Sequence, residues 1–248
     1  ASGDLLWTFN PEIHKHSPRT IALGWNVNRG LAYLDGKLFI GATDGRLIAI
    51  DSATGKQIWA SKTFEPTESK AITGAPRAFN NMVVIGHGGA EYGTRGYVSA
   101  YDADSGDQLW RFYTVPGNPV DGFESPALEM AADTWFGEWW ETGGGGTVWN
   151  AMTYDEELDQ LYIGVGNGDP WDYDLRSEGK GDNLFLGSVV ALNPNTGKYL
   201  WHYQATPGER WDYKSTQDMI LTDLVIEGVS RKVLMQAHMN GHFYILDR

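Results

Sequence analysis

The sequence has no cysteine in its 248 residues. This absence excludes disulfides, zinc–thiolate sites, iron–sulfur clusters and cysteine-linked haem within the chain. There is also no apolar run of roughly 18 residues, so we expect no membrane-spanning helix. Basic residues are few: 19 Lys and Arg stand against 32 Asp and Glu, and the formal net charge is -13. Such a chain offers no basic patch to neutralise phosphates, which argues against a nucleic-acid partner.

An initiator Met, a basic leader and an apolar leader are all missing, and the chain begins and stops inside a recurring motif. We therefore expect a piece of a longer protein, truncated at both ends. What is present is typical of a globular, turn-rich β protein. Hydrophobic residues make up 42% and aromatic residues 13%, with 31 glycines and 11 tryptophans.

A motif that ends in Trp recurs along the chain, and it decides the predicted architecture. Its full copies are AIDSATGKQIW at 49–59, AYDADSGDQLW at 100–110 and ALNPNTGKYLW at 191–201, with partial copies at 1–7 and 244–248. In each copy a strand precedes a tight Thr-Gly or Ser-Gly turn, and a second strand is expected to end on the Trp. The large indole ring is expected to pack between neighbouring units.

The copies lie about 50 residues apart, except that one interval carries about 40 extra residues. Between them, the sequence predicts paired strands at 36–42 and 45–51, 81–86 and 96–100, 160–164 and 188–191, and 232–236 and 242–245. This spacing is typical of an all-β propeller of four-stranded antiparallel blades, each with an inner, two middle and an outer strand. We assign 1–248 to a single, partial propeller domain of about four blades.

The long interval differs from the repeats. A short helix is predicted at 126–132, with Ser125 as its N-cap and Pro126 at its first position. An aromatic-rich stretch follows and contains four consecutive glycines, Gly143–Gly146. They suggest that something flat approaches the backbone closely, and a flexible linker is the alternative. Elsewhere, His14-Lys15-His16 is expected to be a surface loop.

Short motifs lie between the repeats: NRG at 28–30, ITGAPR at 72–77, GGAEYG at 88–93, GGGGTVW at 143–149, GNG at 166–168, WDY at 211–213 and NG at 240–241. Together with the repeat, they resemble the pyrroloquinoline quinone (PQQ)-dependent alcohol dehydrogenases of the methanol and ethanol type. The resemblance extends over essentially the whole chain, and the motifs between the repeats are its specific part. The family implies an eight-bladed propeller, so the remaining blades are expected partners, and this piece alone is expected to be inactive.

The resemblance also implies a chemistry, in which an alcohol is oxidised by hydride transfer to PQQ bound to Ca²⁺. It implies that Glu91 and Asn167 are metal ligands, of the oxygen-donor kind that Ca²⁺ prefers. It implies that Asp212 is the catalytic base. From the residues alone, the alternatives are a solvated loop Glu, an ordinary Asn-Gly turn and a turn Asp.

For the cofactor, the resemblance implies a stacking floor, hydroxyl donors, a guanidinium that faces carboxylates, and small residues that admit the ring system. These roles fall on Trp149, on Thr73 and Thr147, on Arg29, and on Gly89 and Ala90. A planar guanidinium suits carboxylates well. The alternative for Trp149 is core packing.

The chain departs from the family pattern at three places. Leu23-Gly24, followed by Trp25, stands where the family has a vicinal Cys pair. Met239 stands where the family has Lys or Arg, and Met cannot donate a hydrogen bond. Lys214 follows Asp212 by two residues, where lanthanide-dependent relatives carry an added Asp. The direction of Lys214 decides whether it repels a cation or supplies the positive charge that Met239 lacks.

The leading hypothesis is therefore a periplasmic PQQ-dependent dehydrogenase of a small alcohol, with a c-type cytochrome or a fused haem domain as its electron acceptor. One alternative is a non-catalytic propeller that serves as a scaffold for protein interaction. Another is a divergent dehydrogenase with altered substrate range or cofactor affinity.

Overall fold

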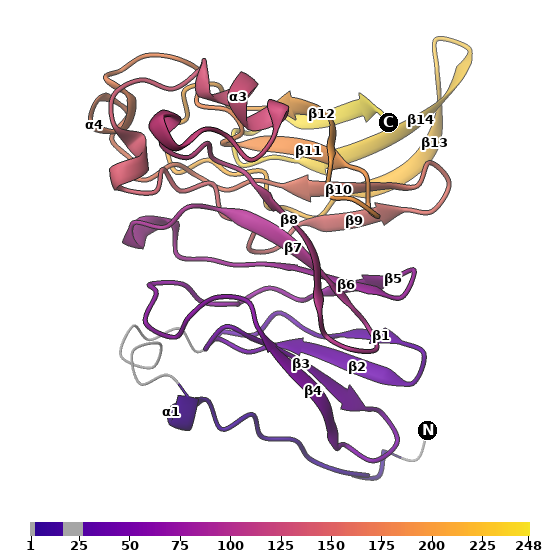
Figure 1. Cartoon of the computed structure of the whole chain (residues 1–248). Helices are drawn as coiled ribbons and strands as arrows, with labels where there is room; N and C mark the ends of the chain where they lie inside the picture. The colour runs from indigo at the N-terminus through magenta and orange to yellow at the C-terminus, as the bar shows by residue number, and fades with distance from the viewer. Residues whose placement is uncertain (1–2, 17–26) are drawn as a thin grey trace.

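The computed structural model describes residues 3–16 and 27–248 of the chain (Figure 1). Leu23-Gly24 and Trp25, where the Cys pair of the family would lie, fall outside the described residues. Four antiparallel sheets follow one another in space in the order of the sequence, from the indigo sheet to the yellow one (Figure 1). The all-β propeller architecture expected from the repeat is confirmed.

Each sheet is built from consecutive strands. The first contains β1 (Ala32–Leu34), β2 (Lys37–Gly41), β3 (Arg46–Asp51) and β4 (Gln57–Lys62). The second contains β5 (Arg77–Phe79), β6 (Met82–Gly86), β7 (Tyr97–Asp102) and β8 (Gln108–Tyr113). The third contains β9 (Met152–Asp155), β10 (Gln160–Gly164), β11 (Ser188–Leu192) and β12 (Tyr199–Gln204). The fourth contains β13 (Ile220–Ile226), β14 (Val229–Ala237) and β15 (Phe243–Asp247).

Short helical segments lie between the strands. They are α1 (Ile13–His16), η1 (Ala90–Tyr92), η2 (Pro119–Asp121), α3 (Pro126–Ala132), η3 (Trp139–Glu141) and α4 (Tyr173–Ser177). The predicted N-cap is confirmed, because the Ser125 side chain accepts a hydrogen bond from the Leu128 amide. The loop expected at His14–His16 is wrong: the segment is one exposed helical turn, in which the Lys15 amide donates to the Glu12 carbonyl at 2.8 Å.

The strand that follows each turn does not end on its Trp, contrary to expectation. β4, β8 and β12 all continue three residues beyond it. The reason lies in the register: Trp59 pairs with Ala49 inside the β3–β4 ladder, and the same Ala–Trp pair recurs in the next two sheets. The backbone beyond the Trp therefore still has hydrogen-bonding partners on the adjacent strand.

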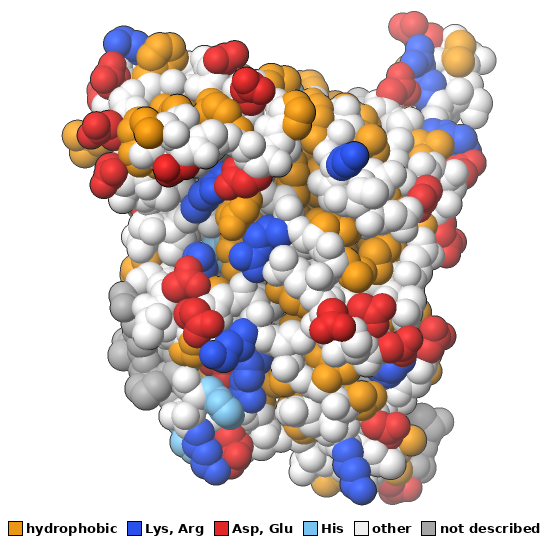
Figure 2. All heavy atoms as spheres, in the orientation of Figure 1, with side chains coloured by type: hydrophobic (Ala, Val, Ile, Leu, Met, Phe, Trp, Pro, Cys, Tyr) orange, Lys and Arg blue, Asp and Glu red, His pale blue; other side chains and the backbone are white. Residues whose placement is uncertain are grey.

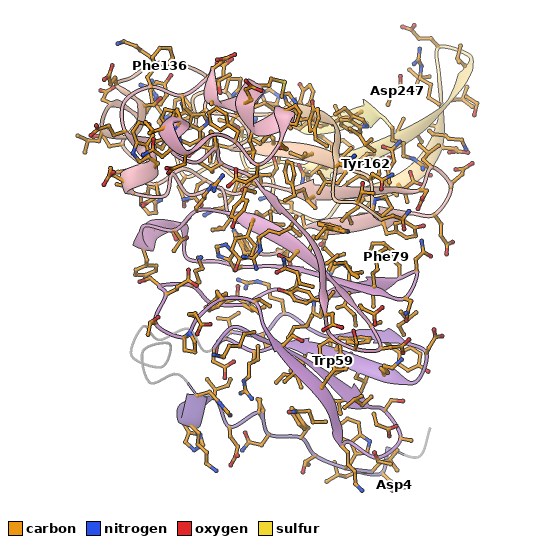
Figure 3. All side chains as sticks on the ribbon, in the orientation of Figure 1. Asp4, Trp59, Phe79, Phe136, Tyr162 and Asp247 are labelled. Carbon is orange, nitrogen blue, oxygen red and sulfur yellow. The ribbon has the colours of Figure 1, made fainter. Side chains whose placement is uncertain are left out.

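The Trp residues fasten each unit to the next, as expected. The indole N–H groups donate to backbone carbonyls one repeat away: Trp7 to Ser52 (3.0 Å), Trp59 to Ala103 (3.2 Å) and Trp110 to Pro194 (2.7 Å). Each ring lies directly on the turn glycine of that repeat; a Cβ on Gly106, for example, would meet Trp59 at 2.8 Å. Figure 3 shows Trp59 and other side chains between the successive sheets.

Buried side chains between the sheets form the core. One apolar cluster runs through the first three sheets, and the stacked rings of Phe79 and Tyr154, 4.0 Å apart, extend it between β5 and β9. A second cluster joins the third and fourth sheets through Tyr162 and Leu234. Within the described part of the chain, no helix is long and apolar enough to cross a membrane.

The fourth sheet has three described strands and several exposed apolar side chains, among them Ile220, Phe243 and Ile245. The β13–β14 hairpin projects beyond its neighbours and carries charged side chains of both signs (Figure 2). Lys232 on this hairpin pairs with Glu157 in the turn between β9 and β10. That further blades cover the exposed apolar side chains stays a prediction.

A histidine is buried where β6 ends. His87 is 1% exposed, its ring lies 4.3 Å from that of Tyr97, and its Nε2 has no hydrogen-bond partner among the described residues. Burial, assisted by the Lys70 cation, lowers the pKa of His87 to about 3. The native state therefore keeps this imidazole neutral at pH values where an unfolded chain protonates it.

The docking of Trp59 predicts a specific cost for Gly106→Ala. Gly106 has φ +79°, and its Cβ would collide with the indole. We expect a loss of about 2–4 kcal/mol in the free energy of unfolding, from left-handed strain and overpacking together. Urea denaturation of the full-length protein measures it. Gly36→Ala is the matched control, because Gly36 has the same φ with nothing within 4 Å. Equal losses in the two variants would contradict the docking role.

His87 predicts an acid-dependent loss of stability. Its folded-state pKa lies below the unfolded value, so its stabilising contribution is complete above about pH 6.5 and is lost as the pH falls toward 3. Between pH 7 and pH 5, wild-type protein should lose about 1–2 kcal/mol more than His87→Phe. Urea denaturation at both pH values tests this, and parallel losses would contradict it.

Candidate functional site

A cavity of about 320 Å³ lies at the ends of several loops. Its lining includes Arg29, Thr73, Trp149 and Lys214, and each of these precedes the first strand of a different sheet. Contacts of β1 with β5 and of β5 with β9 show that these strands are the inner ones. Because the inner strands lie side by side, the loops that lead into them converge at one end of the sheets, and the cavity forms there.

Trp149 and Arg29 form one wall. The Arg29 guanidinium lies over the indole face, 4.7 Å from the ring centroid, which is a cation–π geometry. The Thr73 carbonyl holds Arg29 in place, because it accepts from the Arg29 backbone amide at 3.1 Å and from Nη1 at 3.2 Å. A flat ligand can stack on that indole face only if the guanidinium moves to the edge of the ligand.

Glu91 and Asn167, the predicted metal ligands, are in contact. Asn167 is 1% exposed, and its Nδ2 donates to Glu91 Oε1 at 3.3 Å and to the Gly168 carbonyl at 3.2 Å. For both side chains to ligate one cation, the amide must turn so that Oδ1 faces it. In the described residues, no group of three or more His, Cys, Asp or Glu is arranged to hold a metal. Ca²⁺ takes more than two oxygen ligands, so a cation here would bind backbone carbonyls, other oxygen-bearing side chains or cofactor oxygens in addition to Glu91 and Asn167.

The glycine run explains how the Glu91 and Asn167 side chains meet. All four glycines have positive φ, between 68° and 80°. Gly145 accepts from the Gly96 amide at 2.8 Å, and the Gly146 amide donates to the Asn167 carbonyl at 2.8 Å. The run is thus hydrogen-bonded to the loop after Glu91 on one side and to the Asn167 loop on the other. The flexible-linker alternative is wrong, and the surfaces that approach the run are loops of the chain itself.

Asp212, the predicted base, pairs with Lys214. The Lys214 ammonium lies 2.8 Å from Asp212 Oδ1, and the side chains of Lys214 and Asp212 are 16% and 31% exposed, respectively. Asp212 has φ +60°, a left-handed conformation that costs a non-glycine residue energy and must be held in place by its surroundings. Lys214 lines the cavity, and Asp212 is connected to the cavity through it.

Glu209, which sequence reasoning missed, holds that turn. Its side chain is fully buried, and its carboxylate accepts from the backbone amides of Gly168 (3.1 Å), Trp211 (2.6 Å) and Tyr213 (2.9 Å). Buried Arg176 donates to the Glu209 carbonyl. Glu209 thereby joins the Asn167 loop to the Asp212 turn. A lone Glu in a polar loop carries no sequence signal for this role.

Asp169 adds a second carboxyl near Glu91. Burial, together with the Glu91 carboxylate, raises the pKa of Asp169 to about 6, although a backbone hydrogen bond from Gly93 opposes the shift. Near pH 6 and below, the negative charge of this region is therefore partly suppressed.

The structure thus brings five predicted residues to one cavity: Arg29, Thr73, Gly89, Glu91 and Trp149. Asn167 and Asp212 lie behind the lining and contact it through Glu91 and Lys214. Ala90 and Thr147 are each 1% exposed and lie outside the lining. Their predicted roles at the cofactor stay predictions. Met239 is 45% exposed and is also not part of the lining.

Comparison with known proteins gives close relatives. The chain is 55% identical over 249 residues to the quinohemoprotein alcohol dehydrogenase ADH IIB of Pseudomonas putida, a match that covers 100% of this chain and 36% of the relative. It is 43% identical over 256 residues to the 1-butanol dehydrogenase (cytochrome c) of Thauera butanivorans, with 100% and 36% covered. The crystal structure of the quinohemoprotein alcohol dehydrogenase from Comamonas testosteroni superposes with a TM-score of 0.95 at 54% identity, covering 99% of this chain and 37% of that one.

The chain therefore spans about a third of the length of the curated relatives it matches. The family model described as "PQQ: Glucose/ethanol/alcohol dehydrogenase, beta-propeller domain" matches residues 1–248. The repeat, the four stacked sheets, the cavity and this match over the whole chain agree, and the chain belongs to the PQQ-dependent alcohol dehydrogenase β-propeller family.

Proposed function

We propose that the full-length protein to which this chain belongs oxidises a small alcohol with PQQ as its cofactor. The observation that carries the proposal is the convergence of Arg29, Thr73, Glu91 and Trp149 on one cavity, with Asp212 linked to it through Lys214. A non-catalytic scaffold has no physical need for this set of side chains around a cavity, so the alternative is not favoured.

The chemistry of the cavity fits a flat, polyanionic aromatic molecule. An indole face offers stacking, and Arg29 and Lys214 offer two positive charges at the cavity wall. When bound, PQQ supplies the acceptor for the hydride that leaves the alcohol carbon. The residues of the chain bind and orient both molecules and remove the hydroxyl proton.

Asp212 takes that proton in our proposal. Its Oδ1 is paired with Lys214, which leaves Oδ2 as the oxygen that accepts the proton from the alcohol hydroxyl. Glu209 supports this role because its buried carboxylate holds the amides of Trp211 and Tyr213 on either side of Asp212. A base on a turn fixed in this way loses little conformational freedom when the substrate binds.

We include Ca²⁺ in the proposal, held by the Glu91 carboxylate and the Asn167 amide oxygen. A hard cation with oxygen ligands would polarise the cofactor as a Lewis acid. The electron acceptor we propose is a haem group or a c-type cytochrome, as the names of the quinohemoprotein and cytochrome c relatives suggest. Periplasmic localisation is likewise part of the proposal and rests on the family resemblance alone.

Asp212→Asn should abolish most of the activity. Full-length protein loaded with PQQ and Ca²⁺ should oxidise small alcohols in a dye-linked assay, and kcat of the variant should fall by about 10²–10⁴-fold, because the amide cannot take up the proton. Asp218→Asn, an exposed Asp nearby in the sequence, is the matched control and should keep the wild-type rate. An unchanged rate for Asp212→Asn would remove Asp212 as the base, and no PQQ-dependent rate in wild type would refute the function.

Glu91→Gln should weaken the cation site. Loss of the carboxylate charge should raise the Ca²⁺ concentration for half-maximal reconstitution by about tenfold or more. Titration of PQQ-loaded full-length protein with Ca²⁺, followed by the cofactor absorbance, measures it. Glu138→Gln, at an exposed position, should titrate like wild type. If a chelator left the wild-type spectrum and activity unchanged, the cation would have no place in the mechanism.

A further inference from the structure

Lys214 is the least expected member of the cavity lining. Its side chain is only 16% exposed, and within the described part of the chain its ammonium makes one hydrogen bond, to Asp212 Oδ1 at 2.8 Å. An ammonium has three N–H donors, so two of them are not used by Asp212. Holding a charge that is largely withdrawn from water is unfavourable unless its donors find partners. The position of this group at the cavity wall therefore points to a ligand oxygen.

The backbone around Lys214 is fixed from both sides. On one side, the Tyr213 amide donates to Glu209 Oε1 at 2.9 Å. On the other, the Ser215 amide donates to the Val165 carbonyl at 3.0 Å, and the Gln236 side chain donates to the Ser215 carbonyl at 2.8 Å. Only the side chain of Lys214 has freedom to adjust, so its ammonium stays within reach of the cavity.

The hydrogen bond from Gln236 to the Ser215 carbonyl also places the end of β14 beside Lys214. His238 Nε2 lies 3.0 Å from the hydroxyl oxygen of Ser215, the next residue after Lys214. Met239 follows His238 and has no donor on its side chain. Among the residues that line the cavity, the positive charges are those of Lys214 and of Arg29, which lies at the Trp149 wall.

From this arrangement we infer that Lys214 is a second cationic anchor of the cofactor, which donates to an anionic oxygen of the flat ligand while it keeps its bond to Asp212. The inference rests on the proposed function and deepens it. Lys214 then ties the position of the ligand to the position of the base, because one ammonium bonds to both. It acts as a binding and positioning residue, and it takes no proton in the reaction.

Equilibrium binding of PQQ to the apo full-length protein, measured by calorimetry or by quenching of Trp fluorescence, tests the inference without an activity readout. Lys214→Met should weaken binding by about 10–100-fold, the range for one lost hydrogen bond between charged groups. Lys214→Arg should restore the affinity to within about threefold of wild type, since the guanidinium keeps the charge and the donors. The thermal unfolding midpoint of each variant verifies that it folds.

Two further variants separate direct contact of Lys214 with the ligand from an indirect effect. Lys180→Met is the matched control, because Lys180 also pairs with a carboxylate two residues away, Glu178 at 2.9 Å, but is 58% exposed and lies outside the cavity lining. It should bind PQQ like wild type. Asp212→Asn should lose clearly less affinity than Lys214→Met if Lys214 contacts the ligand directly, because the ammonium is still present.

Equal affinity of Lys214→Met and wild type would overturn the inference and leave the proposed function standing. A loss in Asp212→Asn as large as that in Lys214→Met would also overturn it, because Lys214 would then act only through Asp212. Wild-type protein that binds no PQQ would instead refute the proposed function, and the inference with it.

Discussion

The contact between an indole and a turn glycine one repeat away is the interaction on which the rest of this structure depends. A single sheet of such a repeat cannot bury its apolar face alone, and stacking on neighbouring sheets is what buries it. The Trp59 ring bridges the first two sheets by lying on Gly106 and donating to Ala103, and Trp7 and Trp110 repeat the contact at the neighbouring turns. The repeated contact sets the spacing and order of the sheets, and through them the positions of the loops.

The site follows from that order, since its residues lie in the loops that the stacked sheets bring together. The inner strands of neighbouring sheets are in contact, so the residues that precede them meet at one end. Packing alone does not align the side chains there. The glycine run at 143–146 and the Glu209 carboxylate add the hydrogen bonds that hold the Glu91, Asn167 and Asp212 loops in register. The fold supplies proximity, and these polar contacts supply alignment.

Much of this was predictable from the sequence, and the exceptions have a common cause. The repeat revealed the sheets, the Trp contacts and the middle strands, and the Ser125 cap was legible because a cap is a local pattern. The residues of the cavity wall were predictable only through the family motifs that contain them. The role of Glu209 was not predictable, because its buried contacts involve residues such as Gly168, which lies 41 positions away in the sequence. The direction of Lys214 was not predictable either, because the backbone beside it is held by residues such as Gln236, which lies 22 positions away. The strands that continue past Trp59 were missed because their ends depend on pairing with a partner strand.

The buried carboxylate of Glu209 has one more consequence, which concerns how such a protein can change. It accepts from Gly168 and from Tyr213 at once, so the backbone next to the amide Asn167 and the backbone next to the carboxylate Asp212 share one anchor. Because the Glu209 carboxylate is buried, water cannot replace a hydrogen bond that it loses, and a shift in either loop therefore affects the other. In the proposed mechanism, cation affinity and alignment of the base are therefore coupled. Exposed side chains such as Trp211, by contrast, can be replaced without moving either loop.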